Sequence, residues 1–388
     1  MLDGELNTND LVFVDKDNLV TAKDSYADSY IQSDDILITR TGAKAGATCI
    51  VRELDRPFIV SSHSIRIIPN KELVYPKYLE LFLLSRWGKS QINRLFTGAA
   101  QKQLQLATVS KLVIPLPPLA VQHALVDEME VARNARQRNL AGADELLRSL
   151  DRWLLMQLGL ELPRVDERKV FAVSLGDTAR TSRLNADYFH PERVLTIRAM
   201  QTHKERFDSQ PLSAVVDFVR NLRRTPTGTY LSLAHVQGNT GELVESNETA
   251  EGSCLAFAEN DVLFARLRPY LNKVYRAEMS GVCSPEFHVL RIKDMTRLKP
   301  DYLASILRSS LILAQTRHMM TGNTHPRLTN DDVVNLVIPI PSTAIQELVA
   351  AEVRRRRQNA RRMRQEAETE WDRAKARFEE KLLKGESS

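Results

Sequence analysis

Few residues in this chain have types and spacing that could do chemistry, and the first candidate is a glycine-rich turn. Gly42-Ala43-Lys44-Ala45-Gly46 looks like a phosphate-binding loop at first sight. A P-loop, however, follows the pattern G-x-x-x-x-G-K-[ST], and no Lys-Ser or Lys-Thr follows either glycine. The sequence therefore predicts a turn between two strands. Either its Arg40, Thr41 and Lys44 face DNA, or the turn has only a structural role.

A second polar group lies in the later half of the chain, where Arg266, Arg268 and Lys273 follow an apolar run at 262–265. Arginine can bind guanine with two hydrogen bonds, whereas lysine and threonine more often hold phosphate. Two loops add further donors and acceptors: Gln101, Lys102 and Gln103 in one, and Asn323, Thr324, His325 and Arg327 in the other. These loops differ while their flanks match, as two readers of different DNA sequences would, or as simple loop drift would.

Catalytic and metal motifs are missing from the sequence. Its eight histidines show neither i, i+4 nor HExxH spacing, and its three cysteines lack C-x-x-C spacing, so we predict no metal site and no disulfide framework. It has no Asn-Pro-Pro-Tyr, no Asp-Pro-Pro-Tyr and no glycine-rich cofactor loop. Glu379-Glu380-Lys381 fits a loose acid-x-Lys nuclease pattern, but it lies at a charged helix end, so we interpret it as surface charge.

Length and composition indicate a protein of two domains with additional helix. The chain has 388 residues, of which 43% are hydrophobic and 27% charged. No run approaches the ~20 apolar residues of a membrane span, and the start lacks a secretory signal, so a reducing cytoplasm is the expected location. The net charge of +5 permits nucleic-acid binding without demonstrating it.

The chain contains an internal repeat. Residues 97–122 and 321–346 match at a constant offset, with eleven of 26 positions identical. Each copy has the same order of expected elements. It begins with β-rich runs (36–39, 65–68, 262–265 and 287–292) and a helix after Pro-x-Tyr-Leu (76–86 and 300–310). A polar loop (97–103 and 321–327), a short apolar strand ending in Pro-x-Pro and a long helix follow.

The two long helices are expected at about 119–158 and 343–383. Apolar and small residues recur along both at spacings of three and four, which is typical of a coiled-coil-like seam. So narrow a stripe is poorly buried unless the two helices pack against each other, antiparallel and related by a pseudo-two-fold axis. The seam residues expected to make this contact or to bind a partner are Leu147, Leu154, Arg356, Met363, Trp371 and Phe378.

A dense basic run, Arg354 to Arg357 with Arg361, Arg362 and Arg364, lies on the second helix. Such a run is usually a solvated helix face, and contact with DNA or with another protein is the alternative. Trp153 and Trp371 are expected to pack rather than to bind a ligand.

These patterns predict mixed α/β (α+β) architecture. The expected parts are a first domain at 1–118, a helix at 119–158, a linker at 159–170, a second domain at 171–342 and a helix at 343–384. About 60 residues of the second repeat, 171–230, have no counterpart before Met1. We therefore expect the first domain to be shortened at its amino end.

The ordered motifs resemble the specificity subunits of type I restriction-modification systems. Residues 114–122 and 338–346 resemble the family's junction between a recognition domain and a long helix. Residues 97–104 and 34–42 look like the segments before that junction, and 183–191 looks like the opening of a second half. The missing front of the first repeat departs from the family pattern.

The resemblance implies a non-catalytic reader of a bipartite double-stranded DNA target with two target-recognition domains. Its helices would dock two methyltransferase subunits, and restriction subunits would join them. S-adenosylmethionine, ATP and Mg would belong to those partners, and no cofactor to this chain. Two alternatives remain open: a remnant that acts only as a coiled-coil interaction protein, with at most one functional reader, and a fused DNA-modifying enzyme.

Overall fold

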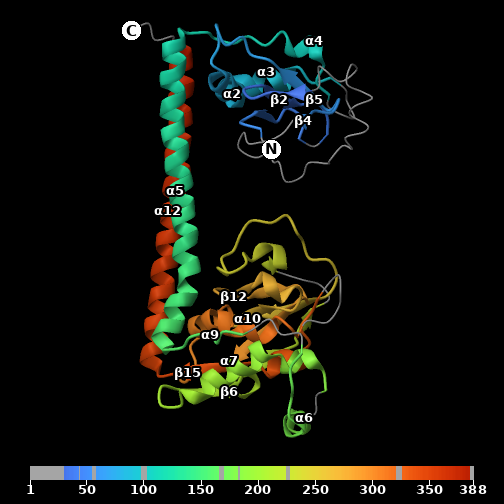
Figure 1. The fold of residues 1–388 in the computed structure, drawn as a ribbon, viewed down its shortest axis with the longest axis vertical. Coiled ribbons are helices and arrows are strands. Elements are labelled where there is room, and N and C mark those ends of the chain that lie inside the picture. Colours follow the sequence, from blue (N-terminus) through green and yellow to red (C-terminus); the bar gives the residue numbers. More distant parts are fainter. Residues whose placement is uncertain are drawn as a thin grey trace. The chain divides into compact units, whose positions relative to one another are not determined.

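A computed structural model describes residues 30–42, 44–54, 58–97, 103–165, 170–181, 184–223, 228–319 and 326–384 (Figure 1). The chain divides into two compact units. Unit 1 contains residues 1–140 and 365–388, and unit 2 contains residues 141–364. Unit 1 therefore combines two segments that are far apart in the sequence, whereas unit 2 is one continuous stretch.

Unit 1 is built on a three-stranded antiparallel sheet in the order β3-β2-β5, with helices packed on one face. Its strands are β1 (Tyr30–Ile31), β2 (Ile36–Thr39), β3 (Thr48–Ile50), β4 (Phe58–Ile59) and β5 (Ser64–Ile67), and its short helices are α2 (Pro76–Leu84), α3 (Arg86–Arg94) and α4 (Leu106–Val109). Pro76 occupies the first turn of α2, where its missing N–H costs nothing. Gly88, in the first turn of α3, lies so close to the end of α2 that a Cβ atom there would clash with the Phe82 carbonyl oxygen, so only glycine fits at this position.

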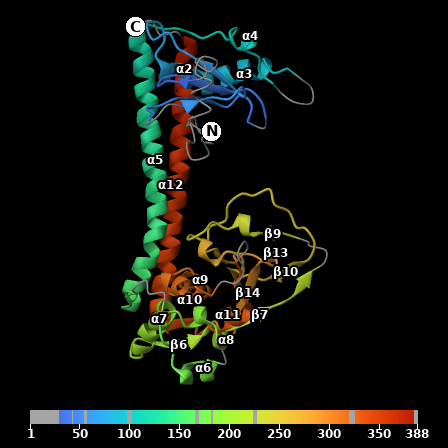
Figure 2. The same ribbon diagram turned by 45° about the vertical axis from the view of Figure 1, so that its right-hand side comes forward.

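Unit 2 is larger and contains two four-stranded sheets (Figure 2). The first has the order β12-β11-β14-β7, the second has the order β8-β10-β13-β9, and β15 pairs separately with β6. The strands are β6 (Phe207–Pro211), β7 (Val216–Val219), β8 (Leu222–Arg223), β9 (Tyr230–Leu231), β10 (Cys254–Phe257), β11 (Val262–Ala265), β12 (Val274–Arg276), β13 (Gly281–Cys283), β14 (Phe287–Ile292) and β15 (Val337–Pro341). The short helices are α6 (Leu175–Thr181), η3 (Ala186–Phe189), α7 (Pro191–Thr202), α8 (Leu212–Val215), η4 (Leu233–His235), η5 (Pro269–Leu271), α9 (Pro300–Leu307), α10 (Ser310–Thr316) and α11 (Asn330–Val334).

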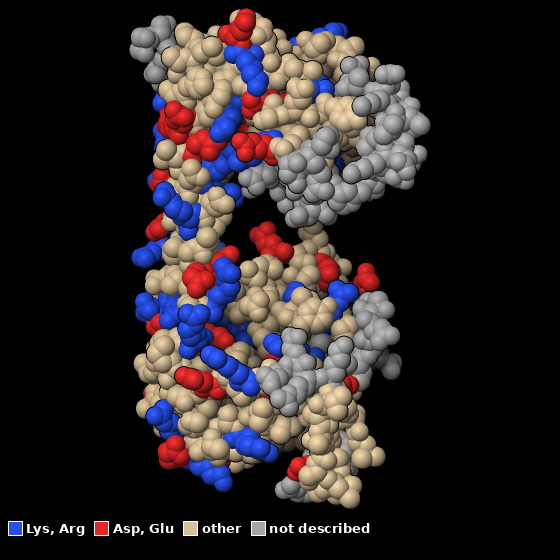
Figure 3. Space-filling model, in the orientation of Figure 1, with Lys and Arg blue, Asp and Glu red and all other residues tan. Residues whose placement is uncertain are grey.

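The two long helices predicted from the seam are confirmed as α5 (Leu119–Leu158) and α12 (Thr343–Lys384). They run antiparallel within each unit. In unit 1, Arg136 binds Glu368 at 2.9 Å and Lys381 binds Glu128 at 2.8 Å. In unit 2, Arg364 binds Asp144 at 2.8 Å. Acidic and basic side chains are interspersed along these helices on the face that Figure 3 shows.

The predicted seam residues face the interior of their own units. Leu147 and Leu154 in unit 2 and Phe378 in unit 1 are buried, and Met363 and Trp371 are partly buried against the same cores. The guanidinium of Arg356 binds Glu352 and the Ser149 hydroxyl. Trp153 also packs against a core, as predicted. Since little of these side chains is exposed, the seam mainly holds each unit together, and its predicted contact with a separate partner stays a prediction.

Equivalent hydrogen bonds confirm the repeat. The Tyr78 hydroxyl donates to the Pro115 carbonyl in unit 1, and the Tyr302 hydroxyl donates to the Pro339 carbonyl in unit 2. The predicted strands 36–39, 262–265 and 287–292 are confirmed, and 65–68 is found one residue earlier, at 64–67. Each helix predicted after Pro-x-Tyr-Leu is broken by a serine, into α2 and α3 or into α9 and α10.

The prediction of a Pro-x-Pro strand in both repeats is right for β15 but wrong for residues 112–117, which form no strand. The reason is that no described residue pairs with them. In unit 2, by contrast, β15 pairs with β6 along its whole length. A single strand has no hydrogen bonds to hold it extended.

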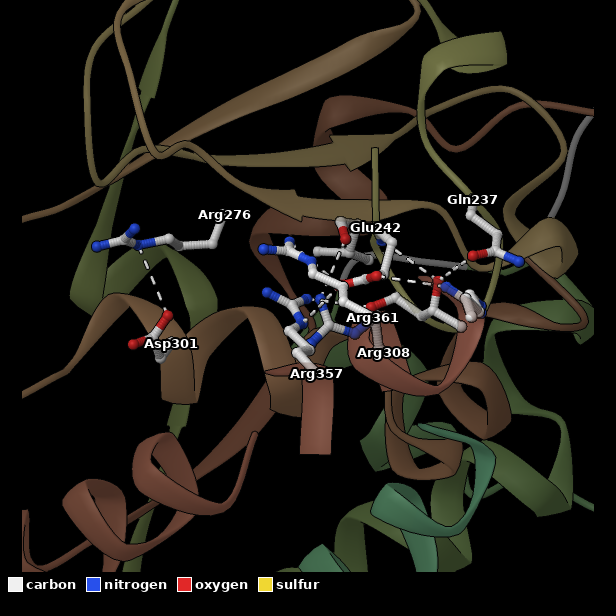
Figure 4. Close-up of polar contacts among 10 residues, drawn as sticks. Gln237, Glu242, Arg276, Asp301, Arg308, Arg357 and Arg361 are labelled. Atoms are coloured by element: carbon white, nitrogen blue, oxygen red, sulfur yellow. Dashed lines mark hydrogen bonds and ion pairs between the residues drawn. The ribbon is translucent and has the colours of Figure 1, made fainter. Parts of the chain in front are cut away.

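The basic run on α12 is only partly the solvated face that its composition predicts, since Arg354, Arg355, Arg361 and Arg362 are exposed and the other three arginines are partly buried. Glu242 is 5% exposed and faces Arg357, Arg361 and Arg364, whose nearest side-chain nitrogens lie 3.8, 3.4 and 3.4 Å from its carboxylate (Figure 4). Nearby, Arg308 is buried, and burial lowers its pKa to about 9. The single carboxylate of Glu242 therefore offsets part of the positive charge in the interior of unit 2.

We predict that Glu242→Ala strongly destabilises unit 2. The substitution leaves three guanidinium groups facing one another without their shared carboxylate, and removing one partner of a buried ion pair typically costs about 3 kcal/mol or more. Chemical denaturation, followed by hydrogen exchange of unit 2 peptides, measures the loss. Glu245→Ala removes an exposed carboxylate three residues away and serves as the control. Equal stability of the two variants would contradict the prediction.

Candidate nucleic-acid interface

The segment after β2 is a turn between two strands, as its sequence predicts. Gly42 and Gly46 have φ angles of 90° and 87°, which glycine adopts without strain. The Gly46 N–H donates to the Thr39 carbonyl at 2.8 Å, and the Ala47 N–H donates to the Lys44 carbonyl at 3.0 Å. These two N–H groups are therefore used inside the turn rather than pointed at a phosphate. The Lys44 side chain is exposed.

The fold brings the two predicted polar segments of unit 1 together. Thr41 forms an isolated β-bridge with Gln103, and the Leu104 N–H donates to the Arg40 carbonyl at 3.0 Å. The Arg40 guanidinium donates a hydrogen bond to the Leu104 carbonyl at 2.9 Å, and the Thr41 hydroxyl lies 2.8 Å from Nδ1 of His63. We call these five residues the unit 1 joint. It connects the end of β2 to the carboxyl end of the polar loop.

Unit 2 contains the same joint at the corresponding residues, Arg266, Leu267, Glu286, Arg327 and Leu328. Leu267 forms the isolated bridge with Arg327, and the Leu328 N–H donates to the Arg266 carbonyl at 3.0 Å. The Arg266 N–H donates to the Glu286 carbonyl at 2.8 Å, just as the Arg40 N–H donates to that of His63 at 2.7 Å. The backbone frame is thus duplicated while the side chains differ.

The unit 2 joint is more highly charged. Arg327 forms an ion pair with Glu286 at 2.7 Å, with side chains 43% and 31% exposed. The hydrogen bonds that the Arg327 guanidinium donates to this carboxylate raise the pKa of Arg327. The pair lies at the surface, where a phosphate could replace the carboxylate.

Arg268 and Lys273 are held by local contacts. Arg268 adopts a left-handed conformation with a φ angle of 49°, and its N–H donates to the Pro326 carbonyl at 2.8 Å. For a residue other than glycine this conformation costs about 1–2 kcal/mol, so the surrounding contacts must impose it. The Lys273 ammonium donates to the Leu233 carbonyl at 2.6 Å, and burial lowers the pKa of the amine. Of the two, Lys273 therefore has the clearer structural role.

Several predicted contact residues lie outside the described part of the chain: Gln101, Lys102, Asn323, Thr324 and His325. The sequence reasoning also missed His63 and Glu286. His63 directly precedes β5, and Glu286 directly precedes β14. Only the pairing of these strands brings the two residues to their joints. No sequence spacing marks this neighbourhood.

The histidine spacing also missed one cluster that could hold a metal. Potential ligand atoms of His190, Glu192 and His318 lie within 4.8 Å of one another, although the third residue is distant in the sequence. The Glu192 carboxylate is already bound by Arg317 at 2.7 Å and by His318 at 2.8 Å. A metal ion would have to displace the Arg317 guanidinium from this carboxylate, so the cluster fits an ion-pair network better than a metal centre.

His288 lies in β14 beneath the unit 2 joint and is 4% exposed. Burial, with a further contribution from Arg266, lowers its pKa from 6.5 to about 4. The folded protein therefore keeps this imidazole neutral at pH values where the unfolded chain binds a proton. Its contribution to stability is present above pH 6.5 and is lost as the pH falls towards 4.

We predict that lowering the pH from 7 to 5 destabilises the wild-type protein more than a His288→Ile variant. Isoleucine occupies the corresponding position of unit 1, Ile65. The difference should reach about 1–2 kcal/mol of unfolding free energy at pH 5, because each pH unit below the unfolded pKa contributes up to about 1.4 kcal/mol. Denaturant titrations at several pH values measure it. A His203→Asn variant controls for the loss of a half-buried histidine. If the unfolding free energies of all three proteins changed with pH in parallel, the destabilisation would not come from His288.

The remaining reactive groups of the described residues form no further candidate site. The three cysteines are free and buried, and burial raises the pKa of Cys49 to about 11 and that of Cys283 to about 12. Glu379 and Lys381 form ion pairs with Arg86 and Glu128, so they are engaged within unit 1 rather than solvated. Among the described residues, no helix is long and apolar enough to cross a membrane.

Comparison with known families gives a match over the first part of the chain. Residues 6–138 match the family "Type I restriction modification DNA specificity domain". A segment of 128 residues is 30% identical to the "Type I restriction enzyme EcoBI specificity subunit" of Escherichia coli. The aligned segment is 33% of this chain and 26% of that relative, so the chain spans about a quarter of the relative's length. The unit 1 joint lies inside the matched segment.

Comparison with solved structures extends over most of the chain. A chain from a structure described as the "Structural basis underlying complex assembly and conformational transition of the type I R-M system" aligns with a TM-score of 0.52 and 17% identity, covering 92% of this chain and 82% of that chain. The S subunit of a type I restriction-modification system from M. genitalium aligns over 92% of this chain and 84% of its own, with a TM-score of 0.41 and 13% identity. The first alignment shows a shared fold.

Proposed function

We propose that this chain is a specificity subunit of a type I restriction-modification system, since residues 6–138 match the DNA specificity domain of that family. It binds a bipartite double-stranded DNA target, with one half-site for each unit. It carries out no reaction itself and positions methyltransferase subunits, two in number, together with restriction subunits. This assembly works in the cytoplasm.

The observation that carries the proposal is the duplicated joint. The matched segment contains one joint, and unit 2 repeats its bridge and its backbone hydrogen bonds with different side chains. Loops on a rigid frame are the usual place for recognition residues. Two equal frames with unequal side chains suit two unequal half-sites. The expected domains, 1–118 and 171–342, would each carry one such surface.

The two rival functions have less support. A fused modifying enzyme needs a cofactor or metal motif, and the sequence offers none. A protein that acts only through its coiled-coil-like helices is not favoured by the match to a DNA specificity domain or by the duplicated joint. The salt dependence of DNA binding distinguishes this second rival from a specificity subunit, because phosphate contacts make the affinity for DNA fall steeply as the salt concentration rises.

The direct test is sequencing of adenine methylation in the host genome, with and without this gene. We expect deletion to abolish methylation at one split motif and reintroduction of the gene to restore it. The motif lost is the target. Unchanged methylation at every motif, in cells where the methyltransferase is expressed, would overturn the proposal.

For the unit 2 joint, we predict that Glu286→Gln strengthens DNA binding and Arg327→Gln weakens it. The first substitution releases Arg327 from its carboxylate, so that the guanidinium can bind phosphate. One additional phosphate contact steepens the dependence of log K on log salt by about 0.9. Fluorescence anisotropy with a target duplex and the methyltransferase complex measures both effects. Glu259→Gln removes an exposed negative charge elsewhere in unit 2 and is the matched control. If it tightened binding equally, the effect would be one of net charge alone.

A further inference from the structure

Unit 2 contains a cavity where the long helices α5 and α12 meet α9 and α10. We call it the unit 2 cavity. Its volume is about 360 Å³, which lies within the range of small-molecule binding sites. Apolar side chains from α5, α10 and α12 make up much of its lining: Leu147, Leu150, Leu154, Leu313, Val349 and Val353. Asn239, Asn272 and Arg308 are among its polar lining residues.

The repeat places a second cavity at the equivalent position of unit 1, with a volume of about 260 Å³. Two pairs of lining residues correspond at the offset of the repeat, Ser85 with Ser309 and Leu84 with Arg308. The shared frame therefore produces the cavity, and individual residues set its chemistry. Since unit 1 has a leucine where unit 2 has Arg308, the frame itself does not require a charge at this position.

Arg308 is a buried cation without an ion pair. It is 8% exposed, and the hydrogen bond that Asn272 donates to its carbonyl at 2.8 Å holds its backbone in place. Its Nη1 donates to the Val274 carbonyl at 3.1 Å, and the described residues give the guanidinium no other hydrogen bond and no carboxylate partner. The nearby carboxylate of Glu242 pairs with three other arginines instead (Figure 4). Burying an unpaired charge is strongly unfavourable, so a bound anion would stabilise this site.

The charges of the lining favour a guest with a single negative charge. Two arginines, Arg148 and Arg308, line the cavity with one aspartate, Asp151, whose carboxylate accepts a backbone N–H at 2.9 Å. Arg148 is exposed and lies 3.9 Å from the carboxylate of Glu145. A carboxylate brings one negative charge and matches the fork of a guanidinium, whereas a phosphate monoester brings nearly two charges at pH 7.

We propose that the unit 2 cavity binds a small molecule that joins one carboxylate to an apolar body. The carboxylate accepts hydrogen bonds from the Arg308 guanidinium, and the apolar body packs among Leu150, Leu313 and Val349. Binding then pairs the buried cation and fills apolar space in the same step. This site lies within unit 2, and the proposal does not rest on the proposed DNA recognition.

The probes are 4-phenylbutyrate and its uncharged analogue 4-phenylbutyramide, each titrated into the full chain by isothermal titration calorimetry. We expect the carboxylate to bind saturably and about tenfold or more tightly than the amide, because only the carboxylate can pair with the guanidinium. Arg308→Leu should abolish this preference. Leucine is the residue of unit 1 at this position, so the variant should fold, which circular dichroism checks. Arg198→Leu removes an exposed arginine of α7 that does not line the cavity, and it should bind both probes like the wild type.

A second variant tests whether the probes occupy this cavity. Leu147→Trp introduces the residue that unit 1 has at the equivalent position, Trp371, and should weaken binding of both probes because the larger side chain narrows the cavity. Unchanged binding by this variant would place the probes elsewhere and contradict the proposal. Equal affinity of the wild type for the two probes would contradict it as well. So would a preference for the carboxylate that survives in Arg308→Leu, or the absence of saturable carboxylate binding by the wild type.

Discussion

The rest of the structure depends on the pairing of α5 with α12. Each helix carries an apolar stripe too narrow to be buried alone, and long isolated helices gain most of their stability from packing. The pairing also closes the cores. Leu154 and Leu158, at the end of the first repeat, are buried in the core of unit 2, whereas Ala374 and Phe378, at the end of the second repeat, are buried in the core of unit 1. Each unit is thus completed by the helix of the other repeat.

On this base, the two copies of the repeat share the same backbone frame and carry different surface side chains. Gln122 binds the Tyr75 N–H and the Leu73 and Pro117 carbonyls, and Gln346 makes the equivalent three bonds in unit 2. Both side chains are fully buried, so losing these bonds would leave buried backbone groups unpaired. The joints differ in charge, since uncharged Thr41 and Gln103 meet in unit 1, whereas Arg327 meets Glu286 in unit 2. Internal frames that match between the two repeats, with divergent surface residues, suit the proposed recognition of two different half-sites.

The sequence predicts the elements of this fold better than it predicts the neighbourhoods of individual side chains. Periodicity gives α5 and α12 almost to the residue, because an uninterrupted apolar stripe is a local signal. It fails at residues 112–117, because a strand also requires a partner and no described residue pairs with them. It fails as well for the joint, since Glu286 reaches Arg327 only through strand pairing. The arginine run shows the same limit: its composition suggests a basic patch, but Glu242, distant in sequence, neutralises part of it.

In unit 1, β5 supports the joint. β5 begins at Ser64, next to His63, whose carbonyl accepts the Arg40 N–H and whose imidazole contacts Thr41. In unit 2 the corresponding strand is held on both sides, by β11 and β7, and its joint carries a charged pair. Among the described residues of unit 1, β5 pairs with β2 alone. The two joints thus share a backbone frame but rest on strands whose described ladders differ. Strand pairing, as well as side-chain identity, therefore distinguishes the two candidate surfaces.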